Sequence, residues 1–200
     1  MPVTYKPPAQ WVPPSFHTPS DQFHGEQATA SIHEAVGRAL STWEHAESAL
    51  IKLFQLLCET KSLAACRAYG TLESVRARLL AIEFAAKEFF AARDRNDCKL
   101  VLSLLKVFEN TTAYRNNIAH GMTVQPHAFG YFLCPPSDSS RRRSTPYPTG
   151  LWGLGAKYFY RVIEIDSCRD RFEEILNSTM SLVLYLNNKY KVLDGADFHP

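Results

Sequence analysis

Apolar residues recur along most of this 200-residue chain at the three- and four-residue spacing of an amphipathic α-helix. This spacing constrains the fold more than any other feature, because an apolar face that repeats every 3.6 residues is buried only when the helix packs on other elements. The stripes predict long helices at residues 31–59, 71–89, 96–120 and 167–190, with a short helical segment at 62–69. Ser31 and Ser167 open capping patterns, so we expect them to begin the first and last long helices.

The spacing changes between the third and fourth predicted long helices. Residues 130–134 and 157–165 are rich in aromatic and β-branched side chains, and they predict two strands that pair antiparallel. Residues 135–156 between them are rich in Pro, Ser and Gly, which predicts a long mobile loop. The sequence therefore predicts a mostly α protein, an antiparallel bundle of four long helices with a β-hairpin and its loop inserted at about residues 124–166.

The chain length favours a single domain, which we place at residues 31–190; a chain of this size buries roughly 70% of the surface that its unfolded form exposes. Residues 1–30 hold six of the twelve prolines together with scattered aromatic residues, and they predict an extended arm. This arm is either a mostly disordered tail or a segment laid across its own domain or a dimer partner. Residues 191–200 are expected to form a frayed tail.

The composition excludes several classes of protein. A formal net charge of +2 argues against coating of nucleic acid through charge alone, so any RNA contact is expected in a local cleft. The five cysteines are widely spaced without a CxxC pair, and the sequence has neither an HExxH motif nor a Gly-rich phosphate loop, so we expect no metal site and no cofactor. No apolar run approaches the eighteen or so residues that span a bilayer, and no secretory signal begins the chain, which predicts a cytoplasmic protein without membrane contact.

The end of the third predicted long helix brings together three side chains of complementary chemistry. Asn116 and His120 are one turn apart on the same face, and the Arg115 side chain is long enough to reach the same groove. The helix dipole favours a protonated histidine in a last turn, and we expect Gly121 to end the helix in the left-handed conformation. An arginine binds a phosphodiester bidentately, and a histidine that titrates near neutral pH moves the proton of a ribose 2′-hydroxyl. The pair therefore suffices for RNA cleavage without metal; the alternative is a helix-end histidine beside a solvated arginine.

The pattern Arg115-Asn116-x-x-x-His120, at the end of a long helix in an all-helical context, resembles the R-[polar]-x-x-x-H signature of the HEPN superfamily. The resemblance covers roughly residues 31–190. It implies a helical bundle that forms a homodimer, with two motifs lining one cleft across a twofold axis. Many similar proteins are metal-independent endoribonucleases of toxin–antitoxin, phage-defence or RNA-processing systems, so RNA and an antitoxin or defence-complex protein are the expected partners. Carried over, Arg115 holds the scissile phosphate, His120 acts on the 2′-hydroxyl, and Asn116 orients one of them.

The sequence departs from part of that superfamily after the histidine. Members paired with a nucleotidyltransferase antitoxin often carry a tyrosine two residues on, where this chain has Met122, so control by nucleotidylation of such a tyrosine is not expected. Catalytically silent HEPN-like domains also exist. The alternative function is therefore a non-catalytic dimer that binds RNA, a nucleotide or a partner protein as a scaffold.

Three further features have two interpretations each. Glu47 interrupts the apolar stripe between Trp43 and Leu50, and it either forms a salt bridge with another helix or orients Arg115 and His120. Tyr114 either packs in the core or stacks on an RNA base. The run Arg141, Arg142 and Arg143 on the predicted loop either closes over an RNA backbone or forms an exposed basic patch.

Overall fold

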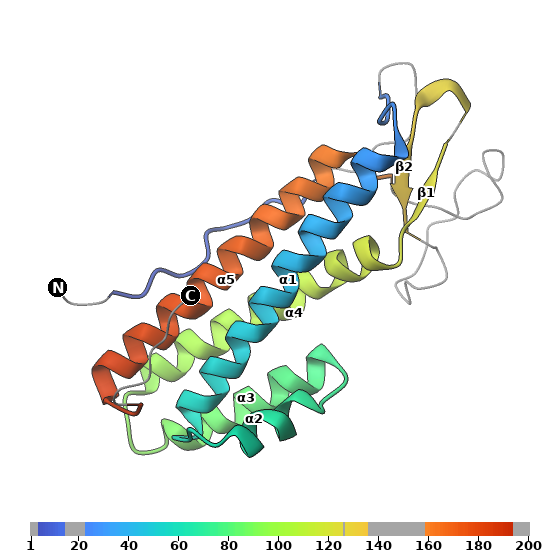
Figure 1. Ribbon diagram of the computed structural model, residues 1–200. Helices are drawn as coiled ribbons and strands as arrows, with labels where there is room; N and C mark the ends of the chain where they lie inside the picture. Colours follow the sequence, from blue (N-terminus) through green and yellow to red (C-terminus); the bar gives the residue numbers. More distant parts are fainter. Residues whose placement is uncertain (1–3, 15–22, 126, 136–158, 194–200) are drawn as a thin grey trace. The chain divides into compact units, whose positions relative to one another are not determined.

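The computed structural model describes residues 4–14, 23–125, 127–135 and 159–193 (Figure 1). These residues are mostly helical, as the sequence predicts. The helices are α1 (Thr29–Leu57), α2 (Leu63–Gly70), α3 (Val75–Phe89), α4 (Arg95–Ala119) and α5 (Val162–Tyr190). Two short strands, β1 (Met122–Val124) and β2 (Phe132–Cys134), flank a 3-10 turn at His127–Phe129. Most of the predicted loop, with Arg141, Arg142 and Arg143, lies outside the described residues, as does the tail from residue 194.

The chain divides into two compact units, each assembled from separated segments. Unit 1 comprises Met1–Gln10, Trp43–Thr112 and Phe172–Pro200, and unit 2 comprises Trp11–Thr42 and Ala113–Arg171. Helices α1, α4 and α5 each contribute one segment to each unit. Neither unit is therefore a continuous piece of sequence.

An aromatic cluster joins three helices in the core of unit 1. Trp43 of α1 meets Phe108 of α4 and Phe172 of α5 edge to face, with ring centroids 5.7 and 5.0 Å apart. All three side chains are fully buried. Edge-to-face pairs of this kind add about 0.5–1.5 kcal/mol to the stabilisation that comes from buried area. Trp43 belongs to the stripe that predicted the first helix, so the periodicity identified this core position.

The first turn of α4 is tied to the last turns of α5, also within unit 1. Asp97 is almost fully buried, and its carboxylate accepts hydrogen bonds from Tyr185 Oη (3.1 Å), Lys189 Nζ (2.8 Å) and Tyr190 Oη (2.6 Å). The hydrogen bonds to Asp97, and secondarily to Asp94, raise the pKa of Lys189 above its ordinary value. A buried carboxylate is tolerated here because all its partners are donors.

The small sheet of unit 2 differs from the predicted hairpin. β2 pairs antiparallel with β1, and Leu133 lies opposite Thr123. Within the predicted partner at 157–165, Tyr160 forms an isolated antiparallel bridge with Leu133, and the residues from Val162 onward are helical. The sequence therefore correctly predicted an antiparallel hairpin between the third and fourth long helices. It assigned the wrong partner to the strand at 130–134, because β1, and not residues 157–165, pairs with it.

Two carboxylates explain why the β-branched run after Tyr160 becomes a helix. The Glu164 side chain reaches back to accept the Arg161 N–H (2.8 Å), and Glu26 Oε1 accepts the Val162 N–H (3.0 Å). These bonds satisfy donors that the first turn leaves without helical partners, so α5 begins five residues before the predicted start at Ser167.

The start of α1 is also displaced from its predicted position. The helix begins at Thr29, so Ser31 lies inside it and does not cap it. Glu34, the expected partner in the capping pattern, instead pairs with Arg38 one turn further along (2.6 Å). An i,i+4 ion pair thus replaces the expected capping contact.

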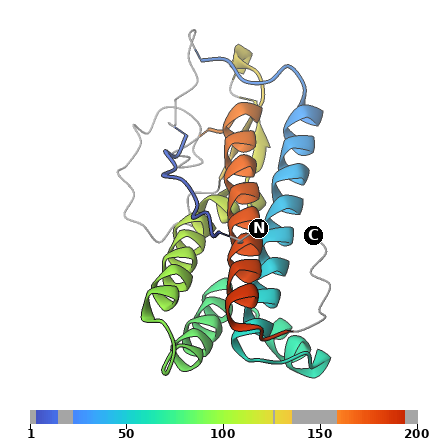
Figure 2. The same ribbon diagram turned by 90° about the vertical axis from the view of Figure 1, so that its left-hand side faces the viewer.

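The described part of the N-terminal arm lies against its own chain. In unit 1, the Ala9 N–H donates to Glu174 Oε1 of α5 (2.5 Å). Figure 2 shows the backbone of this segment running beside α5. In unit 2, the Trp11 ring meets the Tyr114 ring edge to face with centroids 4.9 Å apart. Where the arm is described, it therefore contacts its own chain.

Candidate functional site

The predicted catalytic residues lie at the end of α4, within unit 2. The His120 N–H donates to the Asn116 carbonyl (3.0 Å), and this bond closes the last turn directly after α4 ends at Ala119. The side chains of Asn116 and His120 are exposed, whereas Arg115 is half-buried. Arg115 Nη1 donates to Asn116 Oδ1 at 3.4 Å, a long hydrogen bond between neighbouring residues. A cation, an amide and an exposed imidazole therefore share one end of the helix.

Gly121 turns the chain from α4 toward β1, but not in the predicted conformation. Among the described glycines only Gly130 has a positive φ, +90°, so the left-handed prediction for Gly121 is wrong. Space is the reason that glycine is needed here. A Cβ atom at this position would lie 2.6 Å from Leu133 Cγ and 3.0 Å from the Asn117 carbonyl oxygen. His120 is therefore placed by close approach of the chain to β2.

Two polar contacts fix the surroundings of this turn. Asn117 Nδ2 donates to the hydroxyl of the fully buried Tyr160 (3.0 Å), which joins α4 to the bridge beside β2. His33 Nε2 lies 3.0 Å from Thr123 Oγ1, three residues beyond His120. Neither contact could be predicted from the sequence, because each joins segments at least 43 residues apart.

Aromatic and cationic groups gather beside the motif. The contact of Tyr114 with Trp11 favours the packing interpretation of Tyr114, although both side chains keep some exposure. The Arg171 guanidinium lies 5.8 Å from the centroid of the Trp11 ring, within the range of a cation–π interaction. Trp11 was not a predicted site residue. Its only signal was the scatter of aromatic residues through a proline-rich arm.

Glu47 lies in unit 1 and forms a salt bridge with another helix, which is one of the two roles that the sequence suggested for it. One carboxylate oxygen accepts the Trp43 Nε1–H (2.6 Å), and the other pairs with Arg78 of α3. Only 9% of the Glu47 side chain is exposed, so these partners offset the cost of removing its charge from water. The salt bridge to another helix is confirmed, and we assign Glu47 a structural role.

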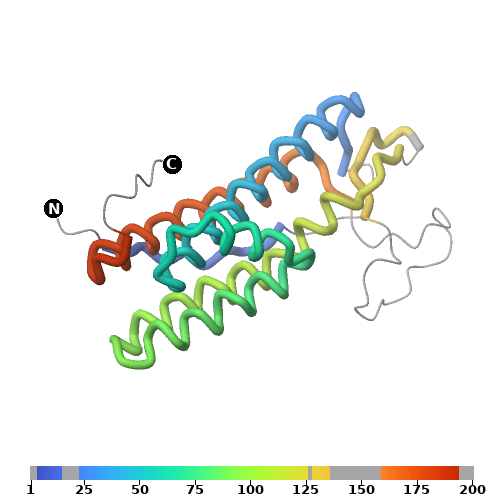
Figure 3. Tube along the Cα trace, turned by 60° about the horizontal axis from the view of Figure 1, so that its bottom comes forward, coloured from blue at the N-terminus to red at the C-terminus, as the bar shows by residue number. Residues whose placement is uncertain are grey.

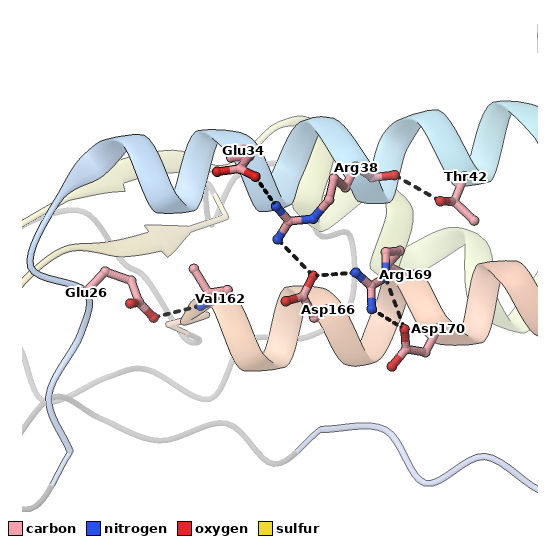
Figure 4. Close-up of polar contacts among 8 residues, drawn as sticks. All are labelled: Glu26, Glu34, Arg38, Thr42, Val162, Asp166, Arg169 and Asp170. Atoms are coloured by element: carbon pink, nitrogen blue, oxygen red, sulfur yellow. Dashed lines mark hydrogen bonds and ion pairs between the residues drawn. The ribbon is translucent and has the colours of Figure 1, made fainter.

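A second set of charges in unit 2 forms a ladder between α1 and α5 (Figure 4). Arg38 of α1 pairs with Glu34 (2.6 Å) and with Asp166 of α5 (3.3 Å). Arg169 pairs in turn with Asp166 (3.3 Å) and Asp170 (2.6 Å). Because each arginine already faces carboxylates, this ladder is suited to joining the two helices and not to binding a phosphate.

Three observations complete the description of the site. The described residues contain no group of three or more His, Cys, Asp or Glu side chains placed to hold a metal ion. None of the helices in the described ranges has the length and apolar character needed to cross a membrane. Comparison of the chain with protein-family models, with curated proteins and with solved structures found no match.

Proposed function

We propose that this chain is a metal-independent endoribonuclease whose catalytic residues are Arg115 and His120. The observation that carries the proposal is the placement of a half-buried arginine, an amide and an exposed imidazole on one helix end. The resemblance to the HEPN signature supports the same assignment. We also propose that the long helices form an antiparallel four-helix bundle. The chain would form a homodimer in which the Arg115–His120 motifs of the two copies line one cleft.

In the proposed reaction, the Arg115 guanidinium binds the scissile phosphate through paired N–H donors. Its contact with Asn116 restrains the guanidinium on the side of the helix that carries His120. A neutral His120 accepts the proton of the ribose 2′-hydroxyl, and the 2′-oxygen attacks the adjacent phosphorus. The bond from phosphorus to the 5′-oxygen breaks, and the second His120 of the dimer, in its protonated form, donates a proton to that oxygen. The products are a 2′,3′-cyclic phosphate and a 5′-hydroxyl.

Incubation of the purified protein with mixed single-stranded RNA in EDTA tests this proposal. We expect wild type to yield fragments with cyclic phosphate ends, and Arg115→Ala or His120→Ala to lower the rate by at least about 100-fold. The matched controls are Arg67→Ala and His45→Ala, which remove exposed side chains of the same types elsewhere and should cleave like wild type.

The melting temperature of each variant separates loss of chemistry from loss of folding. Full cleavage by a folded His120→Ala variant would rule out the proposed mechanism. If folded wild type leaves RNA intact but binds it, and binding survives His120→Ala, the chain is an RNA-binding module and not an enzyme. In that case the proposed role as a nuclease in a toxin–antitoxin, phage-defence or RNA-processing system would have to be revised as well.

A further inference from the structure

An aromatic residue directly precedes the proposed catalytic arginine in α4. Tyr114 and Arg115 are consecutive helical residues, which places them about 1.5 Å apart along the helix axis and about 100° apart around it. Figure 3 shows these last turns of α4 leading into the hairpin. A group that lies against Tyr114 is therefore a close neighbour of whatever Arg115 binds.

Trp11 of the N-terminal arm lies against Tyr114, within unit 2. The ring centroids are 4.9 Å apart and the two planes are nearly perpendicular, at 83°. An edge-to-face contact covers one face of one ring only, and both side chains are partly exposed. Gln10 and Val12 on either side of Trp11 are exposed, so the tryptophan is the residue that this part of the arm places on the domain.

Arg171 of α5 holds the same tryptophan from the interior. Its guanidinium lies 5.8 Å from the centroid of the Trp11 ring, within the range of a cation–π interaction. Only 6% of Arg171 is exposed, whereas Trp11 reaches the surface. Contacts from two helices therefore fix the orientation of a partly exposed indole ring beside the motif.

A fixed aromatic ring next to a phosphate-binding arginine is complementary to a nucleotide. The base offers a flat π face to the ring, and the phosphate offers paired oxygens to the guanidinium. The formal net charge of +2 supplies little general attraction for RNA, so affinity has to come from local contacts of this kind. Stacking accepts any base, because every base has a π face.

We propose that Trp11 is the base-stacking platform of the site. The nucleobase beside the phosphate that Arg115 holds stacks on the indole ring, and Tyr114 and Arg171 keep that ring in place. This inference rests on the proposed RNA substrate and goes beyond it, because it makes the N-terminal arm part of the site. It also restricts the substrate to unpaired nucleotides, since a base inside a duplex has no free face.

Fluorescence anisotropy with a labelled single-stranded 2′-fluoro RNA measures affinity without cleavage, because fluorine replaces the attacking hydroxyl. We expect Trp11→Ala to raise Kd about tenfold, and Trp11→Phe, which keeps an aromatic ring, to raise it much less. The matched control is Phe84→Ala, which removes a 66% exposed ring from α3 in unit 1 and should leave Kd unchanged.

An oligomer of the same length whose sugars carry no bases isolates the stacking contact. Wild type and Trp11→Ala should bind this oligomer equally, because neither stacks a base on it. A Trp11→Ala variant that has lost its fold would instead bind both oligomers poorly.

Cleavage kinetics separate the platform from the catalytic residues. A stacked base is bound in the ground state and the transition state alike, so the loss in Trp11→Ala should appear as a KM about tenfold higher, whereas His120→Ala lowers kcat. Equal Kd values for wild type and Trp11→Ala would overturn the platform even if RNA is cleaved, and so would tighter binding by Trp11→Ala, which would mean that the arm covers the site. Binding of RNA that depends on Trp11 but leads to no cleavage would uphold the platform and refute the nuclease.

Discussion

At the residue scale, the turn after His120 depends on the absence of a side chain at position 121. Leu133 Cγ and the Asn117 carbonyl occupy the space that a Cβ atom would need. The sequence indicated that a glycine was important here but not why, since a pattern along one segment carries no information about a strand twelve residues further on. Arg115, Asn116 and His120 could be found because their relation is set by helical spacing alone.

We expect Gly121→Ala to lower the free energy of unfolding by about 1–3 kcal/mol, because the new methyl group collides with the packed Leu133 side chain. Urea unfolding measures the change. Gly37→Ala is the matched control; nothing lies within 4 Å of its added Cβ atom, and alanine at this α1 position should stabilise the chain by about 0.5–1 kcal/mol. Equal effects at the two positions would contradict the steric explanation.

The Glu47–Arg78 pair gives a second prediction. Glu47→Ala should cost about 3 kcal/mol, because it leaves the Arg78 guanidinium and the buried Trp43 indole N–H without their carboxylate partner. Glu88→Ala on α3 removes an exposed carboxylate and should change stability by less than about 0.5 kcal/mol. Thermal unfolding of both variants tests this. If Glu47→Ala destabilises the chain no more than Glu88→Ala does, the Glu47–Arg78 pair contributes little to stability.

At the element scale, the helices could be predicted, whereas several of their ends and the strand partner could not. Apolar periodicity is a local property of the sequence, so it located α1, α3, α4 and α5. The start of α5 depends on Glu26, which lies 136 residues from the N–H that it accepts. β-Branched residues after Tyr160 favoured a strand by propensity, and capping carboxylates together with burial of Ile165 outweighed it.

The true and the predicted caps of α5 can be compared directly. Glu164→Ala should lower stability by about 1–2 kcal/mol and speed amide exchange in the first turn, because the Arg161 N–H loses its acceptor. Asp170→Ala, which removes the acidic residue three positions after the predicted cap Ser167, should cost less than about 0.5 kcal/mol, since its side chain is 64% exposed. Hydrogen exchange and urea unfolding of both variants decide between the two starting points.

At the scale of the whole molecule, buried thiols link stability to alkaline pH. Burial raises the pKa of Cys134 to about 11, and burial together with the charge of Glu164 raises that of Cys168 to about 12. Below pH 9 the thiols are protonated whether the chain is folded or unfolded, so their contribution to stability is complete. Above pH 9 the unfolded chain releases these protons first, so stability falls as the pH rises toward the folded pKa values.

We therefore expect the free energy of unfolding to decline between pH 9 and 11. Cys168→Ala should make the decline shallower by up to about 1 kcal/mol per pH unit, whatever its effect at pH 8. Cys58→Ala, which removes an exposed thiol, should change the slope less. Urea unfolding at several pH values provides the measurement, and identical slopes for wild type and Cys168→Ala would contradict the linkage.

The partners of Asp97 have a consequence for synthesis on the ribosome. Its three hydrogen-bond donors come from residues 185–190, and both units include part of α5. Translation proceeds from the N-terminus, so α1, α3 and α4 are complete before the segment that buries their remaining apolar surface has been made. Until then the Asp97 carboxylate lacks these donors and stays hydrated, and the apolar surface that α5 covers stays exposed. Both units therefore finish folding only when α5 has left the exit tunnel.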